Sequence, residues 1–208
     1  NNLVFSSSCT VYGQPTELPV TEQAPLQKAT SPYGNTKQIC EDIIQDYITS
    51  NPLFKASLLR YFNPIGAHPS ACIGELPKGI PNNLVPFITQ TAAGIRKELQ
   101  VFGNDYNTPD GSAIRDYIYV VDLAKAHVAS LNRILNNNVN KACEICNLGT
   151  GTGVSVLEMI HAFEQATGVT VPYSIAPRRA GDIEQVWAST SYANKLLNWK
   201  ADTPLIEI

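Results

Sequence analysis

Two kinds of hydrophobic pattern alternate along the first part of the chain. It opens on a short apolar run, LVFSS at residues 3–7, which ends in hydroxyl side chains and predicts a strand. Apolar side chains, Ile39 and Ile43 among them, then recur at helical spacing across residues 33–50, which predicts an amphipathic helix. KASLLRYF, residues 55–62, predicts a second buried strand. A strand, a helix and a strand in this order favour a parallel α/β layout with a right-handed crossover.

The rest of the chain continues the alternation after one irregular stretch. Residues 63–83 are too rich in glycine and proline for regular structure, and a loop of this length in a compact domain is more often functional than idle. Ser155 and Glu158 form an S-x-x-E pattern, which predicts a capping box at the start of a helix. Further helices are expected at residues 83–96, 121–135, 155–167 and 191–197, and further extended segments at 99–103, 114–120, 143–149 and 171–175.

Composition and charge narrow the class of protein. The 208 residues fit one large domain or two small ones, either of which can bury a sizeable core. With 44% hydrophobic and 16% charged residues, the composition is typical of a soluble globular chain. A formal charge of -3 and a pI near 5.6 argue against nucleic acids or anionic membranes as partners. No apolar run approaches the roughly 20 residues of a membrane helix, and no signal peptide opens the chain.

The five cysteines are odd in number and mostly scattered, which is typical of a protein kept in the reducing cytoplasm. Cys143 and Cys146 form a CxxC match, so a redox site and a zinc site both come into question. In the strand predicted here, however, residues three apart point to opposite faces. No second CxxC or nearby Cys/His pair completes a zinc set. A structural role is therefore favoured for both cysteines, and no metal site is expected.

The start of the chain predicts that the sequence belongs to a longer protein. Met159 is the only methionine, so Asn1 is not a native translation start. A buried strand this close to a terminus usually has partners on both sides, and here one partner would come from sequence before Asn1. We therefore expect an N-terminally truncated chain whose sheet has an uncovered edge.

Three glycines, Gly149, Gly151 and Gly153, lie between a predicted strand and a predicted helix, as in a dinucleotide-binding loop. Their spacing is G-x-G-x-G rather than G-x-G-x-x-G, and no clear acidic residue follows at a strand end to hold a ribose. The cluster is thus either a tight turn or a phosphate loop, and the turn is favoured. If the protein uses a dinucleotide, we expect its phosphate loop to precede Asn1.

Tyr33 and Lys37 are four residues apart and therefore share one face of the predicted helix. An ammonium close to a phenol favours the ionised phenolate, which can act as a general base toward a sugar hydroxyl. Ser8 and Asn63 follow the two predicted strands on either side, at the strand ends where α/β sheets place ligands. The pattern predicts a catalytic crevice, and the alternative is a surface aromatic beside turn-forming hydroxyls.

Motifs along nearly the whole chain resemble one family in order and spacing. They are SSSCTVYG, SPYGNTK, LRYFNPIGAHP, GIPNNL, VFGNDYNTPDGSAIRDYIYVVDLAKAH, NLGTGTGVSV and APRRAGD. The family is the extended short-chain dehydrogenase/reductases, and the resemblance within it is to the UDP-glucose (UDP-galactose) 4-epimerases. The family's first hundred or so residues, with their NAD fingerprint, and a short C-terminal tail have no counterpart in this chain.

The resemblance implies an NAD-binding Rossmann domain with a parallel sheet and a smaller mixed α/β domain for the UDP-sugar. Residues 1–62 would be the C-terminal half of the Rossmann domain. Residues 63–208 would mainly bind the UDP-sugar, with about 115–149 returning to the Rossmann domain. The family usually forms homodimers through a pair of helices, one of which would carry Tyr33.

The resemblance also implies residue roles. Tyr33 would be the catalytic base, Lys37 its partner, and Ser8 a hydrogen-bonding partner of the sugar O4. Cofactor-binding positions would be Ser6, Ser7, Tyr33, Lys37 and Phe62, with Phe62 bordering the nicotinamide. The UDP-sugar would be held by Ser8, Asn63, Asn83, Leu84, Phe102, Arg115, Arg179 and Asp182. Tyr33 would remove the 4-hydroxyl proton while C4 gives hydride to NAD, and hydride would return to the other face of the 4-keto sugar.

Two departures refine the expected activity. Related 4,6-dehydratases carry an acidic pair where this chain has Cys9 and Thr10, which favours epimerisation over dehydration. Relatives that reject N-acetylated sugars tend to carry tyrosine where this chain has Val186, so UDP-GlcNAc and UDP-GalNAc are further expected substrates. The alternatives are a UDP-glucuronate epimerase or decarboxylase, or a chain that is catalytically inert by itself because it lacks the NAD loop.

Overall fold

A computed structural model describes residues 2–29 and 31–208 of the chain. Asn1, on which the expectation about the start of the protein rests, lies outside the described residues, as does Thr30. The helices are α1 (Pro32–Ser50), α2 (Leu84–Ala92), α3 (Val120–Leu135), α4 (Val156–Thr167) and α5 (Ser191–Leu197), with 3-10 turns η1 (Cys9–Tyr12) and η2 (Leu205–Glu207). The strands are β1 (Asn2–Ser8), β2 (Lys55–Tyr61), β3 (Asn63–Ile65), β4 (Leu99–Phe102), β5 (Ile114–Arg115), β6 (Tyr117–Tyr119), β7 (Cys143–Leu148), β8 (Val154–Ser155), β9 (Tyr173–Ala176) and β10 (Gln185–Val186).

The elements predicted from the hydrophobic pattern are confirmed, with differences at their ends. α2 ends at Ala92 rather than at residue 96, because Gly94 takes a φ of +72° that leaves the helical region. The extended segment at 114–120 is two short strands that flank Asp116. The capping box of α4 is confirmed by hydrogen bonds in both directions between its N-cap residue and N3 residue. The turns η1 and η2 and the short strands β3, β8 and β10 were not predicted. The expectation that residues 63–83 are irregular throughout was wrong at its start, because β3 pairs with β6 there.

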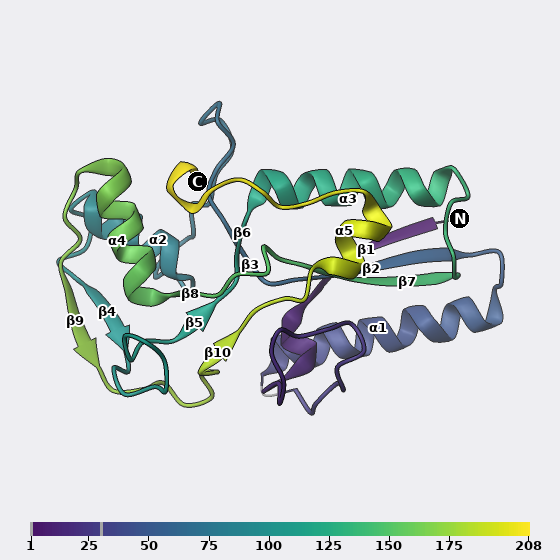
Figure 1. The fold of residues 1–208 in the computed structure, drawn as a ribbon, viewed down its shortest axis with the longest axis horizontal. Helices are drawn as coiled ribbons and strands as arrows, with labels where there is room; N and C mark the ends of the chain where they lie inside the picture. Colours follow the sequence, from purple (N-terminus) through teal and green to yellow (C-terminus); the bar gives the residue numbers. More distant parts are fainter. Residues whose placement is uncertain (1, 30) are drawn as a thin grey trace.

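β1, β2 and β7 form a parallel sheet in the order β1-β2-β7, and within the described residues β1 pairs on one side only. α1 lies on one face of this sheet, and α3 lies with α5 on the other (Figure 1). Ile44 and Leu58 belong to the apolar cluster beneath α1, whereas Leu59 and Leu123 belong to the cluster beneath α3. The predicted α/β class with a parallel sheet is confirmed.

The two cysteines of the CxxC match lie on opposite faces of β7, as predicted. Cys143 borders the cluster beneath α1, and Cys146 is buried in the cluster beneath α3. Burial raises the pKa of Cys146 to about 12 and that of Cys143 to about 11, so both stay protonated thiols at neutral pH. Neither can act as a reactive thiolate in this environment.

Two short strands, β3 directly after β2 and β6 directly before α3, pair in parallel and form a separate two-stranded sheet. Between them and beyond β7, α2 and α4 pack around a second apolar core with β4 and β9 (left side of Figure 1). β5 joins β8 and β10 in a small mixed sheet near the middle of the molecule. None of the described helices is long and apolar enough to cross a membrane.

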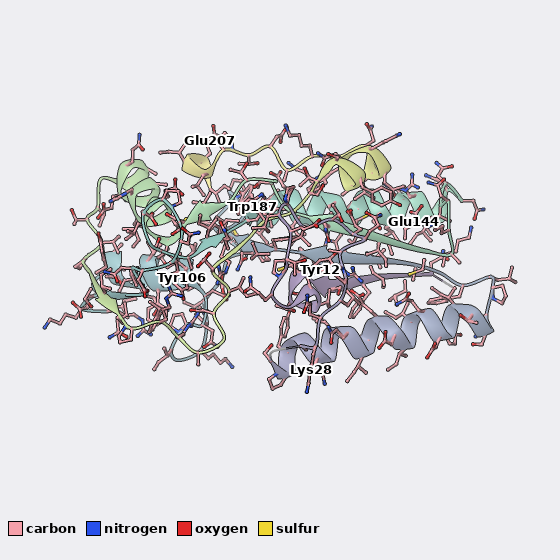
Figure 2. All side chains as sticks on the ribbon, turned by 60° about the horizontal axis from the view of Figure 1, so that its bottom comes forward. Tyr12, Lys28, Tyr106, Glu144, Trp187 and Glu207 are labelled. Atoms are coloured by element: carbon pink, nitrogen blue, oxygen red, sulfur yellow. The ribbon has the colours of Figure 1, made fainter. Side chains whose placement is uncertain are left out.

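A row of polar residues crosses the main sheet one position before its strands end. Ser7 on β1 lies opposite Arg60 on β2, and Arg60 lies opposite Asn147 on β7. All three are buried, and Tyr12 of η1 covers the row near the centre of the molecule (Figure 2). Because buried polar groups need partners, this row must be satisfied from neighbouring elements.

Candidate functional site

Ser8 ends β1 and caps the turn η1. Its Oγ accepts hydrogen bonds from the Thr10 backbone N–H at 3.2 Å and from Thr10 Oγ1 at 3.0 Å. Both contacts use oxygen lone pairs of Ser8. They hold its hydroxyl group in place at the carboxyl end of the sheet.

Tyr33 and Lys37 lie on the first two turns of α1, which begins with a Ser31 N-cap and Pro32. Lys37 Nζ donates to the Ser6 carbonyl at 2.8 Å and lies 5.4 Å from the centre of the Tyr33 ring. The structure therefore brings the predicted base and its cation together at the uncovered side of β1. Tyr33 is 54% exposed, so its phenol is accessible to a bound molecule.

The serine hydroxyls predicted to bind a cofactor are engaged within the protein. Ser6 Oγ lies 3.3 Å from His127 Nε2 on the α3 side of the sheet. Ser7 is fully buried, and its Oγ donates to Glu41 Oε1 at 2.5 Å. The Ser6 carbonyl, rather than a serine hydroxyl, contacts the Tyr33–Lys37 pair, since it accepts the hydrogen bond from Lys37. The cofactor-binding roles of Ser6 and Ser7 stay predictions.

Glu41 fills the centre of the polar row and was missed by the sequence analysis. It is fully buried and accepts from Arg60 at 2.9 Å (Nε to Oε1) and at 2.5 Å (NH2 to Oε2). Burial alone lowers the pKa of Arg60, but the hydrogen bonds and charge of Glu41 outweigh it and raise this pKa. The partners of Glu41 lie on other elements of the fold, so the sequence pattern gives no signal for it.

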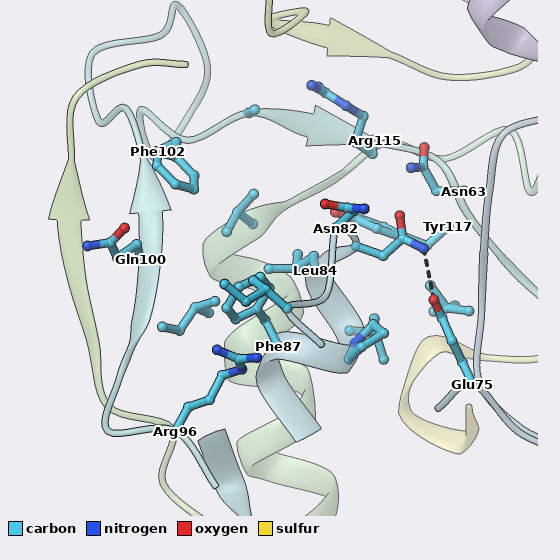
Figure 3. Close-up of a pocket in the computed structure, with 18 of the residues that line it drawn as sticks. Asn63, Glu75, Asn82, Leu84, Phe87, Arg96, Gln100, Phe102, Arg115 and Tyr117 are labelled. Carbon is cyan, nitrogen blue, oxygen red and sulfur yellow. Dashed lines mark hydrogen bonds between the residues drawn. The ribbon is translucent and has the colours of Figure 1, made fainter. Parts of the chain in front are cut away.

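A cavity of about 680 Å³ lies between α2, β4, β5 and the loop before β10 (Figure 3). Its size suits a nucleotide-sized ligand. Apart from Ser8, all the residues predicted to hold a UDP-sugar line this cavity. They are Asn63, Asn83, Leu84, Phe102, Arg115, Arg179 and Asp182. The structure thus gathers residues that are separated by up to 119 positions in the sequence.

Two guanidinium groups converge on one carboxylate in the cavity wall. Arg179 donates to Asp182 through Nε and NH2, each at 3.1 Å, and Arg115 NH2 lies 4.0 Å from the same carboxylate. Arg179 also lies over the Phe102 ring, 5.0 Å from its centre. Paired guanidinium groups beside an aromatic wall form a site suited to phosphate oxygens and a flat base.

The cavity also has lining residues that the sequence analysis missed. Gln100 lies two residues before Phe102 on β4, so the two share one face of the strand (Figure 3). Glu75 accepts a hydrogen bond from Asn83 Nδ2 at 2.9 Å, which orients that amide. Strand alternation could have identified Gln100, whereas the fold of the irregular 63–83 segment gives no such signal.

The glycine cluster turns around a buried carboxylate. Asp116 accepts hydrogen bonds from the backbone N–H groups of Thr150 at 2.8 Å and Gly151 at 3.1 Å. A Cβ on Gly149 would lie 2.3 Å from Asp116 Oδ2, so only glycine fits there. Because these N–H donors serve an internal carboxylate, the structure favours the turn over the phosphate loop.

Residues 9 and 10 offer no acid/base pair. Burial raises the pKa of the Cys9 thiol to about 12, and Thr10 is bonded to Ser8.

Val186 is buried near Phe62 in a shared apolar cluster and pairs with Arg115 across β5 and β10. Within residues 2–29 and 31–208, no group of three or more His, Cys, Asp or Glu side chains could hold a metal ion.

The chain is similar to a described protein family and to known relatives. Residues 1–208 match the family model described as GDP-mannose 4,6 dehydratase. The chain is 58% identical over 199 residues to a UDP-glucose 4-epimerase of Cyamopsis tetragonoloba, which covers 96% of the chain and 56% of that relative.

Two solved structures of similar proteins carry ligands. The UDP-glucose-4-epimerase of Stenotrophomonas maltophila, with bound NAD and formylated UDP-arabinopyranose, has a TM-score of 0.94 and 50% identity over 99% of the chain and 60% of that protein. The UDP-glucose 4-epimerase of Bifidobacterium longum, in complex with NAD+ and UDP, has a TM-score of 0.92 and 50% identity over the same shares. The chain therefore spans 56–60% of the length of these proteins.

Proposed function

The chain belongs to the family described as GDP-mannose 4,6 dehydratase, and from this premise we propose that it carries the substrate site and catalytic base of a UDP-hexose 4-epimerase. The proposed reaction interconverts UDP-glucose and UDP-galactose with NAD as cofactor, as part of galactose metabolism. The observation that carries the proposal is the cavity in which Arg115, Arg179 and Phe102 meet. The epimerase relatives at 50–58% identity favour this activity within the family.

The residues near Ser8 argue for epimerisation over dehydration. Elimination of water from a 4-keto sugar needs an acid and a base at the neighbouring carbons. Cys9 is a partly buried thiol with a raised pKa and Thr10 is a hydroxyl already bonded to Ser8, so neither supplies a carboxylate. The chemistry available at this edge is proton transfer at a single hydroxyl.

Tyr33 is proposed to take the proton from the sugar 4-hydroxyl. The Lys37 ammonium lies 5.4 Å from the centre of the Tyr33 ring, and Ser8 is proposed to donate a hydrogen bond to the sugar oxygen. After the sugar has turned over in the cavity, the same phenol returns the proton to the opposite epimer. Loose contacts to the sugar together with tight contacts to the UDP moiety would permit this turn.

The residues around Lys37 fit a nicotinamide ribose. An ammonium has three N–H donors, and the contact given to Ser6 uses one of them, which leaves donors for ribose hydroxyls. Phe62 is proposed to border the nicotinamide. NAD, when bound, supplies the oxidation and reduction at C4, while the chain supplies position and charge.

The diphosphate is proposed to bind where Arg115 and Arg179 converge. Both guanidinium groups now face the Asp182 carboxylate, so an anionic group is already accommodated at this point. Asn63, Asn83 and Leu84 complete the contacts proposed for the UDP-sugar.

Val186 is proposed to widen the range of sugars. A valine leaves more room than a tyrosine, and it lies in the apolar cluster that contains Phe62. We therefore extend the proposed substrates to UDP-GlcNAc and UDP-GalNAc.

A UDP-glucuronate epimerase or decarboxylase is the second candidate function, because such an enzyme would use the same base and cofactor.

The wider organisation is also proposed. Residues 1–62 and about 115–149 would form part of an NAD-binding domain, and the rest of 63–208 would form the UDP-sugar domain. Ile39, Ile43 and Tyr47 form an exposed apolar face on α1, which supports a homodimer contact. The five free thiols support a cytoplasmic location.

The test is an epimerisation assay on a completed protein. This protein joins the chain to the residues that the Cyamopsis tetragonoloba relative carries outside the matched region. We expect conversion of UDP-galactose to UDP-glucose in the presence of NAD, and no turnover by the present chain assayed in parallel. A completed protein that acts on UDP-glucuronate but not on UDP-galactose would favour the second candidate instead.

A further inference from the structure

Asp116 lies between two residues of the cavity wall but does not itself line the cavity. Arg115 precedes it on β5 and Tyr117 follows it on β6, and both side chains line the cavity. The Asp116 carboxylate is fully buried on the other side of the backbone. A charged group in such a place needs strong partners to offset the loss of hydration.

Those partners come from two separate segments of the chain. Asp116 Oδ1 accepts from Thr150 N and Thr150 Oγ1, each at 2.8 Å, and Oδ2 accepts from Gly151 N and Ala188 N, each at 3.1 Å. The Asp116 carbonyl accepts from Asn63 N at 2.9 Å. Asp116 thus ties together the loop after β7, the segment after β10 and the start of β3.

The surroundings are shaped around this carboxylate. Gly149 leaves room for it, since a Cβ there would lie 2.3 Å from Oδ2. Burial raises the pKa of Asp116 from its ordinary value, and the hydrogen bonds from Thr150, Ala188 and Gly151 oppose that rise. Such a set of convergent donors holds the carboxylate in one orientation.

Arg115, by contrast, has little local support. β5 is two residues long, and its registered pairs with β8 and β10 are limited to Ile114 and Arg115. Its guanidinium donates to the Ile114 carbonyl at 2.8 Å and lies 4.0 Å from Asp182. A strand this short does not fix its own register, so its position depends on the anchor at the next residue.

We propose that Asp116 is a positioning residue that holds Arg115 at the diphosphate site. The inference rests on the proposed UDP-sugar function and adds a residue outside the cavity to its binding machinery. If Asp116 merely stabilised the fold, its loss would weaken all ligands in the cavity alike. If it positions Arg115, its loss weakens ligands that carry the diphosphate more than those that lack it.

The experiment measures the dissociation constants of UDP and uridine by calorimetry with the present chain. The unaltered chain is expected to prefer UDP, and a chain that binds neither ligand would contradict the proposed function itself. In Asp116→Asn one of the two acceptor oxygens becomes an amide NH2 group that faces backbone N–H donors, so half of the anchor is lost. We expect the preference for UDP over uridine to fall about tenfold, as for one misplaced charge-assisted contact.

Asp122→Asn is the matched control. Asp122 is also buried and anchors a distant segment, with Thr203 N at 3.2 Å and Thr203 Oγ1 at 2.6 Å from Oδ2, but it does not line the cavity. We expect lower thermal stability and an unchanged UDP-to-uridine ratio. If Asp116→Asn does not fold, Thr150→Val removes one donor to Asp116 and should lower the ratio in the same direction. An unchanged ratio in a folded Asp116→Asn or Thr150→Val variant would overturn the proposal.

Discussion

Glu41 on α1 and Arg60 on β2 form a two-point ion pair inside the protein, with both side chains at most 3% exposed. The pair joins the helix that carries Tyr33 and Lys37 to the sheet that ends in Ser8. Ser7 donates to the same carboxylate, and Tyr12 accepts a hydrogen bond from Arg60 at 3.0 Å. The relative position of the proposed base and the strand end therefore depends on a network of charges and hydroxyls rather than on apolar packing alone.

Breaking this pair from one side should be costly. Arg60→Met leaves Glu41 buried without its cation, and we expect a loss of about 3–5 kcal/mol in the free energy of unfolding. Urea unfolding of the present chain measures it. Lys125→Met is the control, because Lys125 is 63% exposed in its pair with Asp122 and should cost less than about 1 kcal/mol. A similar small loss for Arg60→Met would show that the buried pair contributes little.

Tyr33→Phe should remove activity without removing stability. The phenol is half exposed, so the fold barely depends on it, whereas loss of a general base lowers kcat by about 10²–10⁴. The measurement is kcat for UDP-galactose in the completed protein. Tyr47→Phe, on the same helix and similarly exposed, is the matched control and should retain full activity. A Tyr33→Phe variant with normal kcat would exclude Tyr33 as the base.

Glu22 should make stability fall as pH rises. Burial raises its pKa above the ordinary value, so the folded state holds its proton more tightly than the unfolded state does. Its favourable contribution is present at low pH and is lost between the ordinary pKa, about 4.3, and the raised one. Glu22→Gln can still accept the hydrogen bond from Asn147 N, which now goes to Glu22 Oε1 at 2.9 Å.

Urea unfolding of both proteins between pH 4 and pH 8 tests this expectation. The stability of Glu22→Gln relative to the unaltered chain should improve as pH rises and then level off. A difference that is constant with pH would mean that Glu22 has the same pKa in the folded and unfolded states.

Val186 should set the range of sugars in the completed protein. We expect turnover of UDP-GlcNAc as well as UDP-galactose, and we expect Val186→Tyr to lose the N-acetylated substrates selectively. The ratio of kcat/KM values for the two sugars measures this, because overpacking of the buried cluster affects both alike. Normal turnover of UDP-galactose without any turnover of either N-acetylated sugar would contradict the proposal.

Much of the fold was predictable because it rests on local periodicity. The strand around Leu58 is a mostly apolar run that is buried on both faces, which the sequence pattern displays directly. The spacing of Ile39 and Ile43 predicted the helix α1, but both of these side chains are exposed. The buried face of α1 carries Glu41 and Ile44 instead. The opposite orientations of Cys143 and Cys146 follow from strand geometry alone. The early end of α2 at Ala92 was missed, because the left-handed conformation of Gly94 is set by the turn that follows.

The site was predictable only in part. Motif resemblance identified Arg115 and Arg179, and the structure brings both to one cavity. Glu41 and Asp116 were not identified, since each owes its importance to partners 19 or more positions away in the sequence. Polar pairing across a sheet has no periodic signal, so such residues become visible only when the strands are assembled.

The most direct test of the account is a calorimetric titration of the present chain with UDP. The cavity, Arg115 and Arg179 all lie within this chain. We predict saturable binding of one UDP per chain, with affinity at least about tenfold weaker in Arg179→Met, as for loss of a bidentate charge-assisted contact. Absence of binding by the folded chain, or equal binding by the variant, would contradict the claim that this cavity holds the UDP-sugar.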